Sequence, residues 1–250
     1  MRRPSRVYSR KFLVEASRGI CFNNLMADSI VLVSGGMDSA VTAAIAASRG
    51  TAAFLHINYG QRTEASELKS FNAIADYFRI KERLAVDITY LKKIGGSALT
   101  DTSIDVPEGD LSRQDVPSTY VPFRNANFLS IAVSWAEVIA AKKIYIGAVE
   151  EDSSGYPDCR ETFFIAFEKA ANLGKRPGVD LSIATPLIHM RKAEIVRKGL
   201  ELKAPLHLTW SCYRDETLAC GECDSCLLRL RGFKEAGAID PIPYRVRAAF

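Results

Sequence analysis

A short loop at residues 34–39, with the sequence SGGMDS, has the residue types needed to hold a chain of phosphates. Two adjacent glycines let the backbone approach a ligand closely, and N–H groups at the start of a following helix attract an anion. The hydroxyls of Ser34 and Ser39 can donate hydrogen bonds to phosphate oxygens, whereas the carboxylate of Asp38 would act through Mg²⁺. The alternative is an ordinary glycine turn with Asp38 capping the helix. The order of these residue types, after a strand and before a helix, favours pyrophosphate binding.

Four closely spaced cysteines form the second group with a clear chemistry, namely Cys212, Cys220, Cys223 and Cys226. Four thiolates complete a tetrahedral zinc shell and leave no open position for a catalytic water. Clustered cysteines in a chain of this size indicate metal binding rather than disulfides. The spacing therefore predicts a structural Zn²⁺ site that attaches the C-terminal segment to the domain, with an iron–sulfur cluster as the alternative.

Buried strands alternate with amphipathic helices along most of the chain, and this pattern predicts an α/β fold with a doubly wound, mostly parallel sheet. A long irregular stretch, 95–120, interrupts the pattern and is typical of a lid or binding loop. We expect strands at 29–33, 52–58, 83–88 and 143–147, and helices at 38–48, 64–78, 127–141, 160–173 and 192–202. Pro241 and Pro243 argue against a long final helix.

The composition fits a globular enzyme with an anionic ligand. Hydrophobic residues make up 48% of the 250 residues, and the formal net charge of +4 is too small to indicate nucleic-acid binding. No apolar run is long enough for a membrane helix. We expect a flexible N-terminal extension at 1–28, one catalytic domain at 29–204, and a zinc-binding segment at 205–250 packed on that domain.

Several further stretches have the residue types expected of a binding site. They are 58–62 (NYGQR), 120–125 (YVPFRN), 152–160 (DSSGYPDCR), 185–187 (TPL) and 192–195 (KAEI). The loop at 34–39 resembles the PP-loop of the N-type ATP pyrophosphatases. Together with the other stretches and the cysteine cluster, it resembles one branch of that superfamily, the 7-cyano-7-deazaguanine (preQ0) synthases, over about residues 30–244.

This resemblance implies an adenine-nucleotide α-hydrolase type of fold and a C–N bond-forming ligase activity. The expected reaction is the ATP-dependent conversion of 7-carboxy-7-deazaguanine and ammonia to 7-cyano-7-deazaguanine, a precursor of queuosine. An adenylated acid and then an adenylated amide would be the intermediates, and AMP and pyrophosphate would be released. The resemblance also implies a cytoplasmic homodimer that contacts neither nucleic acid nor membrane directly.

The same resemblance assigns roles to individual residues. Asp38 and Lys192 would be catalytic. Nucleotide binding would fall to Ser34, Gly35, Gly36, Asp38, Ser39, Tyr59 and Arg62. Substrate binding would fall to Arg124, Asn125, Asp158, Cys159 and Arg160. Taken singly, each of these substrate residues also has a structural explanation: Asn125 and Asp158 are good helix caps, and Cys159 is a typical small buried residue.

The sequence departs from the resembled family at two positions. Phe123 stands where the family usually has glycine, which puts close approach of the substrate at that point in doubt. Met37 replaces a common glutamine, a change that matters less because this side chain need not touch phosphate. Other PP-loop enzymes, such as a tRNA thiolase or an amide-forming ligase, are the alternative enzymes, and a zinc-dependent binding module is the non-enzymatic alternative.

Overall fold

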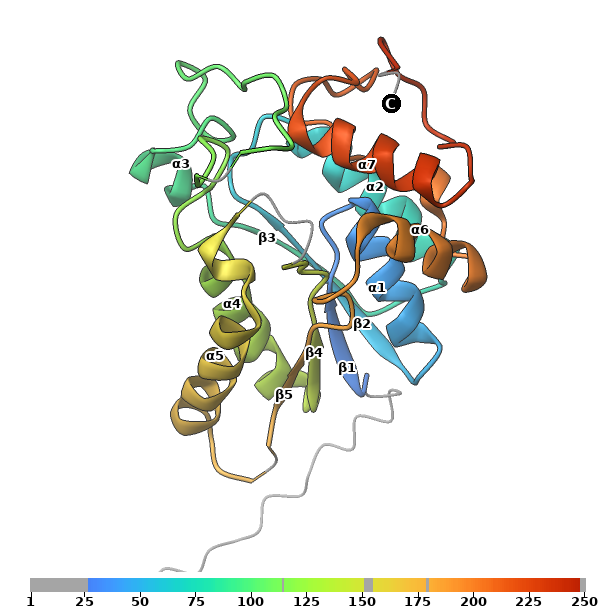
Figure 1. Cartoon of the computed structure of the whole chain (residues 1–250). Coiled ribbons are helices and arrows are strands. Elements are labelled where there is room, and N and C mark those ends of the chain that lie inside the picture. The colour runs from blue at the N-terminus through green and yellow to red at the C-terminus, as the bar shows by residue number, and fades with distance from the viewer. Residues whose placement is uncertain (1–26, 114, 151–154, 179, 248–250) are drawn as a thin grey trace, which may run out of the picture.

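A five-stranded parallel sheet forms the centre of the molecule in this computed structural model, which describes residues 27–113, 115–150, 155–178 and 180–247. The strand order is β3-β2-β1-β4-β5, and every neighbouring pair is parallel (Figure 1). The strands are β1 (Ser29–Leu32), β2 (Ala52–Asn58), β3 (Arg83–Asp87), β4 (Lys143–Tyr145) and β5 (Ser182–Ala184). The predicted extension up to Met26, and residues 152–154 of one motif, lie outside the described residues.

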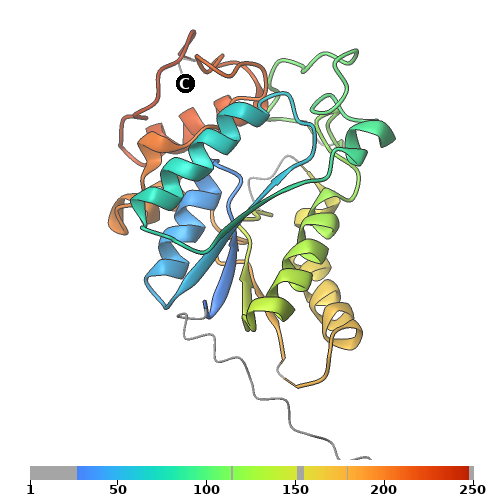
Figure 2. The ribbon, with the colours of Figure 1, turned by 180° about the vertical axis from the view of Figure 1, so that it is seen from behind.

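Helices cover both faces of the sheet, as Figures 1 and 2 show. One face packs on α4 (Arg124–Ile139) and α5 (Glu161–Gly174), and the other on α1 (Met37–Ala47) and α2 (Glu64–Tyr77). Strand β1 shows the reason, because Ile30 belongs to the first apolar cluster and its neighbour Val31 belongs to the second. Successive side chains on a strand point to opposite faces, so a strand covered on both sides must be apolar throughout.

The C-terminal part of the chain adds a further layer beside α1. Helix α6 (Lys192–Glu201) packs on α1, and α7 (Asp224–Glu235) packs on α6. Their shared core includes Val41, Ile195 and Phe233. A fully buried ion pair between Arg229 and Asp240, with a Nε–Oδ2 distance of 2.8 Å, ties the segment after α7 back to that helix. The division of the chain at residue 204 stays a prediction.

The sheet order reverses between β1 and β4, which lie side by side at its centre. The chain proceeds from β1 through β2 to β3 in one direction, and from β4 to β5 in the other. Loops that leave neighbouring strands in opposite directions open a crevice at the carboxyl ends of those strands. The loop at 34–39 follows β1, and Gly147 follows β4, so both lie at this crevice.

The predicted α/β class and parallel sheet are confirmed, and most predicted elements match the observed ones to within a few residues. Among the described residues, five elements were not predicted: α3 (Tyr90–Ile94), β5, α7 and the two short 3-10 helices η1 (Pro157–Cys159) and η2 (Leu206–Leu208). Helix α4 begins at Arg124, three residues earlier than expected.

The irregular stretch at 95–120 packs on the cysteine-rich segment, where Gly109 N–H donates to the Glu222 carbonyl at 2.7 Å. None of the described helices is long and apolar enough to cross a membrane.

Glycine at position 147 is required by the close packing of β4 on helix α1. A Cβ atom there would lie 2.9 Å from Thr42 Oγ1 and 3.0 Å from the Asp38 carbonyl oxygen. We expect Gly147→Ala to lower the free energy of unfolding by about 1–3 kcal/mol, measured by urea denaturation, because overpacking moves the first turn of α1. Gly174→Ala, at a helical position with no atom within 4 Å, is the matched control and should cost nothing. Equal stability of the two variants would contradict the packing shown here.

Candidate active site

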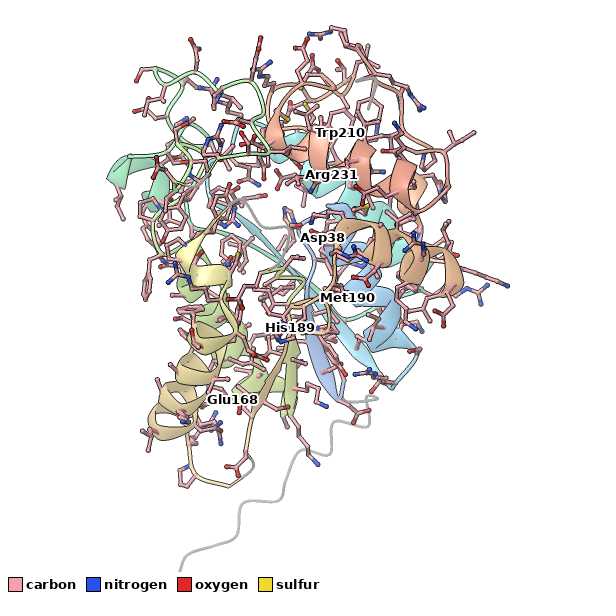
Figure 3. All side chains as sticks on the ribbon, viewed as in Figure 1. Asp38, Glu168, His189, Met190, Trp210 and Arg231 are labelled. Atoms are coloured by element: carbon pink, nitrogen blue, oxygen red, sulfur yellow. The ribbon has the colours of Figure 1, made fainter. Side chains whose placement is uncertain are left out.

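A cavity of about 260 Å³ opens at the crevice above the centre of the sheet. Its wall combines the loop at 34–39, the ends of β2 and β4, the first turns of α2 and α4, and the segment around the cysteines. Asp38 and Trp210 both line it, and Figure 3 places Asp38 near the centre of the molecule, below the C-terminal segment that carries Trp210. Parts of the chain that are distant in sequence therefore meet around one cavity.

The backbone of the loop at 34–39 is held so that the N-terminus of α1 faces the cavity. Gly35 has a φ of +94°, and a Cβ atom there would lie 2.5 Å from the carbonyl oxygen of Glu67. The carbonyl of Gly35 accepts a hydrogen bond from the backbone N–H of Trp210 at 2.9 Å. The hydroxyls of Ser34 and Ser39 lie 3.3 Å apart on the same side. An anion at this place would meet the first backbone N–H groups of α1. The two hydroxyls could also donate to it by turning from their present acceptors, Ser39 Oγ for Ser34 and the Gly36 carbonyl for Ser39.

Asp38 does not cap helix α1, because Gly36 holds the N-cap position and Asp38 lies within the first turn. Its Oδ2 accepts a hydrogen bond from the Lys192 ammonium at 2.5 Å. Its Oδ1 is buried and has no hydrogen-bond partner among the described residues. An unpaired buried carboxylate oxygen is costly, and a hard cation such as Mg²⁺ is the partner that oxygen ligands of this kind prefer. The two residues predicted to be catalytic are thus brought together.

Arg124 lies at the opposite side of the cavity, at the start of α4. Its guanidinium lies 5.4 Å from the ring centroid of Tyr59 and 5.5 Å from that of Phe128. Its Nη1 donates to the Tyr59 hydroxyl at 3.3 Å, and its Nε is buried without a partner among the described residues. Burial raises the pKa of Tyr59 well above its usual value, so this tyrosine is neutral. The guanidinium therefore keeps donor capacity for a ligand in the cavity.

Asn125, Asp158 and Cys159 form one hydrogen-bonded group beside Arg124. Asp158 Oδ2 accepts from the Asn125 backbone N–H at 2.9 Å, and the Asn125 side chain donates to the Asp158 carbonyl at 2.9 Å and to Cys159 Sγ at 3.4 Å. Asn125 and Cys159 line the cavity, whereas Asp158 is buried behind its wall and holds the first turn of α4. Burial raises the pKa of the Cys159 thiol to about 11, so it is not a thiolate at neutral pH.

Four residues with predicted binding roles do not line the cavity: Gly35, Arg62, Asp158 and Arg160. The Arg62 guanidinium instead donates to three backbone carbonyls of the irregular stretch, those of Ala98, Asp101 and Ile104, at 2.6–2.9 Å. Arg160 is exposed and provides the N-cap of α5. A position just after a strand does not by itself fix the direction of a side chain, and here both arginines point elsewhere.

Phe123 also lies outside the cavity, so the departure from glycine at this position leaves the pocket open. The residue has a φ of +56°, in the left-handed region, and caps α4. Its ring packs edge-on against Phe163, with centroids 6.0 Å apart. A non-glycine residue in this conformation costs about 1 kcal/mol, so the chain keeps the backbone geometry of a glycine at a modest cost.

Several cavity residues had no role predicted from the sequence: Glu67, Phe128, Tyr156, Trp210, Ser211, Tyr213 and Arg229. Most come from helices or from the cysteine-rich segment, where a polar or aromatic residue looks like an ordinary surface or core position. The sequence offered an indication only for Trp210 and Ser211, because they directly precede Cys212, the first cysteine of the cluster.

The four clustered cysteines are buried, and their Sγ atoms all lie within 4.8 Å of one another. Ligand sulfurs of a tetrahedral zinc site are roughly 3.8 Å apart for bonds of about 2.3 Å, and Cys220 Sγ lies 3.9 Å from Cys226 Sγ. Backbone N–H groups point at the sulfurs, since Cys212 Sγ accepts from the N–H of Arg214 at 3.4 Å and from that of Cys220 at 3.3 Å. Such donors stabilise thiolates, so the donor set fits a metal ion.

The chain matches the family model described as queuosine biosynthesis protein QueC over residues 28–237. A 7-cyano-7-deazaguanine synthase from Chlorobium phaeobacteroides is 58% identical over 220 residues, which is 88% of this chain and 97% of that protein. Its counterpart from Chlorobaculum parvum is 56% identical over the same shares. An NH3-dependent NAD synthetase from Campylobacter jejuni aligns with a TM-score of 0.42 and 13% identity over 74% of this chain and 68% of its own, too weakly to inform function.

The contacts of Asp158 predict a structural role that can be measured. Asp158→Ala removes the acceptor for the Asn125 N–H at the start of α4 and should lower the free energy of unfolding by about 1–2 kcal/mol in urea denaturation. Asp158→Asn keeps an oxygen acceptor and should cost clearly less. If Asp158→Ala unfolded at the wild-type urea concentration but bound substrate poorly, Asp158 would instead be a substrate contact.

Proposed function

Because the chain belongs to the QueC family of queuosine biosynthesis proteins, we propose that it converts 7-carboxy-7-deazaguanine and ammonia to 7-cyano-7-deazaguanine at the expense of ATP. The observation that carries the proposal is one cavity lined by the loop at 34–39 and by the stacked, partly unpaired guanidinium of Arg124. Ammonia as the nitrogen donor, a homodimeric assembly and a cytoplasmic location belong to the proposal and rest on the family resemblance.

The reaction needs two activations of oxygen. A carboxylate is a poor acyl donor because its leaving group would be oxide, so the carboxylate first attacks the α-phosphate of ATP and pyrophosphate leaves. Ammonia then displaces AMP and gives an amide. The amide oxygen attacks a second ATP in the same way, and loss of AMP leaves the nitrile. Both activations are attacks on an α-phosphate, so one phosphate loop serves both.

The loop at 34–39 would hold the phosphates throughout. The N–H groups at the start of α1 and the hydroxyls of Ser34 and Ser39 donate to phosphate oxygens, while Gly35 and Gly36 let the backbone come close. The oxygens of Asp38 would hold Mg²⁺, which supplies charge neutralisation to the phosphates when it is bound. Lys192 fixes the direction of the Asp38 carboxylate, because its ammonium donates to Oδ2. These groups act by positioning and by stabilising negative charge.

The deazaguanine would occupy the space between Arg124 and the aromatic residues of the wall. Arg124 is stacked over Tyr59 and Phe128 and can pair with the carboxylate of the substrate in a bidentate manner. A flat base suits a pocket with several aromatic walls, among them Tyr156 and Tyr213. Asn125 and Cys159 complete the wall beside Arg124. Arg62, Arg160 and Asp158 are left out because none of them lines the cavity.

Zinc is the proposed metal of the four-cysteine cluster, and its proposed role is structural. Four buried thiols with backbone donors leave no position for substrate. The cluster lies directly beside the cavity wall, because Cys223 caps helix α7 and Ser225, Leu228 and Arg229 of that helix line the cavity. Metal binding would therefore hold one wall of the site in place.

A product assay tests the proposed function. Purified protein with ATP, ammonia and 7-carboxy-7-deazaguanine should yield the nitrile by mass spectrometry, together with AMP and pyrophosphate. Asp38→Ala should reduce turnover by at least about 100-fold, because the phosphates lose their cation site. Asp76→Ala removes an exposed carboxylate far from the cavity and should retain full activity. Absence of the nitrile with the wild-type protein would overturn the proposal, and full turnover by Asp38→Ala would overturn the phosphate assignment.

Metal analysis tests the cluster separately. The wild-type protein should contain about one zinc per chain, and Cys223→Ser should lose most of it and unfold at lower temperature. Cys159→Ser is the control, since this thiol lies outside the cluster, and it should keep the wild-type zinc content. Iron and sulfide in place of zinc would support an iron–sulfur cluster instead.

A further inference from the structure

Glu67, in the first turn of α2, is a cavity-lining carboxylate that the mechanism above does not use. Both of its oxygens are held by neutral side chains. Oε1 accepts from the Thr63 hydroxyl at 2.9 Å, and Oε2 accepts from the Gln61 amide at 3.0 Å. Gln61 is fixed in turn, because its own carbonyl oxygen accepts the Tyr59 backbone N–H at 2.9 Å. The carboxylate is therefore oriented without a direct ion pair.

The main chain of Glu67 lies against the phosphate loop. Its carbonyl oxygen would be 2.5 Å from a Cβ atom on Gly35, so α2 and the loop are in direct contact at this point. Its side chain shares the cavity wall with Tyr59 and Arg124, the residues at the proposed substrate position. Glu67 thus lies between the place where phosphates would bind and the place where the carboxylate of the substrate would be.

The charged groups around Glu67 leave it able to change its protonation state. Arg124, on α4, favours the carboxylate, while Glu64, one turn earlier on α2, opposes it. Tyr59, beside it in the cavity wall, is neutral because its pKa is raised by burial. Across the cavity, Asp38 is paired with Lys192. Burial is the dominant effect and raises the pKa of Glu67 to about 7, so both protonation states are accessible near neutral pH.

The proposed reaction requires a proton acceptor in the cavity. When ammonia attacks the acyl adenylate, the C–N bond forms, the C–O bond to AMP breaks, and the nitrogen must lose one proton to give the neutral amide. After the amide oxygen is adenylated, the same nitrogen must lose two more protons as the second C–O bond breaks and the nitrile forms. The adenylation steps themselves move no proton from nitrogen.

We propose that Glu67 is the general base that removes these protons from the nitrogen of the substrate. This inference rests on the function proposed above. The other acids and potential bases of the cavity are less suitable: Asp38 serves the phosphates, the Cys159 thiol holds its proton to high pH, and Tyr59 is neutral. A base with a pKa near the working pH can take up each proton and release it to water before the next step.

Glu67→Gln tests the inference, with Glu64→Gln on the same helix turn as the matched control. The new amide can still accept from Gln61 and can donate to the Thr63 hydroxyl, so the unfolding midpoint in urea should stay at the wild-type value. With ATP and 7-carboxy-7-deazaguanine but no ammonia, Glu67→Gln should release pyrophosphate at the wild-type rate. With ammonia present, nitrile formation should fall by about 100-fold or more.

The pH profile distinguishes a base from a positioning residue. At a constant concentration of unprotonated ammonia, kcat/KM for nitrile formation in the wild-type protein and in Glu64→Gln should fall as the pH drops below about 7, because protonated Glu67 cannot accept a proton. Glu67→Gln should lose this dependence. Nitrile formation at the wild-type rate, or an unchanged pH profile, would overturn the role of Glu67 while leaving the proposed function intact. Equal loss of pyrophosphate release would show that Glu67 only positions the phosphate loop.

Discussion

The ion pair between Asp38 and Lys192 joins the phosphate loop to the second half of the chain. Lys192, the first residue of α6, packs against Gly232 of α7. A Cβ atom on Gly232 would lie 2.8 Å from the Cβ atom of Lys192, so only glycine allows α6 and α7 to come this close. Helix α7 begins at Asp224 and is capped by Cys223, one of the four clustered cysteines. The direction of one carboxylate in the loop therefore depends on α6, on α7 and, through them, on the cysteine cluster.

Charge is buried around this cavity in ways that are unfavourable for folding alone. Asp38 Oδ1 and Arg124 Nε lack partners among the described residues, and Glu67 is held only by neutral groups. Each such group costs on the order of 1–3 kcal/mol. The Arg229–Asp240 ion pair is also buried, but its atoms have hydrogen-bond partners. The unsatisfied atoms gather where ligands would supply the missing partners, which is typical of a binding site.

The sequence predicted the features that depend on local order, and it failed where long-range contacts decide. The loop at 34–39 and strand β2 follow from short patterns. Strand β5 has only three half-buried residues. Helix α7 was not predicted, because Cys223 caps it and Cys226 lies in its first turn, so this stretch was assigned to the metal site. Asp158 was a plausible cap for the helix that follows it, but its carboxylate instead accepts the backbone N–H of Asn125 in the first turn of α4. Glu67 occupies an ordinary helical position, and only the tertiary structure brings it to the cavity wall.

The hydrogen bond from Trp210 N–H to the Gly35 carbonyl has a consequence for the order of events during synthesis. The phosphate loop leaves the ribosome early, but the residues that close its cavity are made only after most of the chain. Contacts between such distant segments form late, since their loop-closure entropy must be met first. A nascent chain can therefore fold the β1–α1–β2 unit well before the cavity beside the loop at 34–39 is complete. The four cysteines that could hold a metal ion are complete only once Cys226 has been made, so this cluster also forms late.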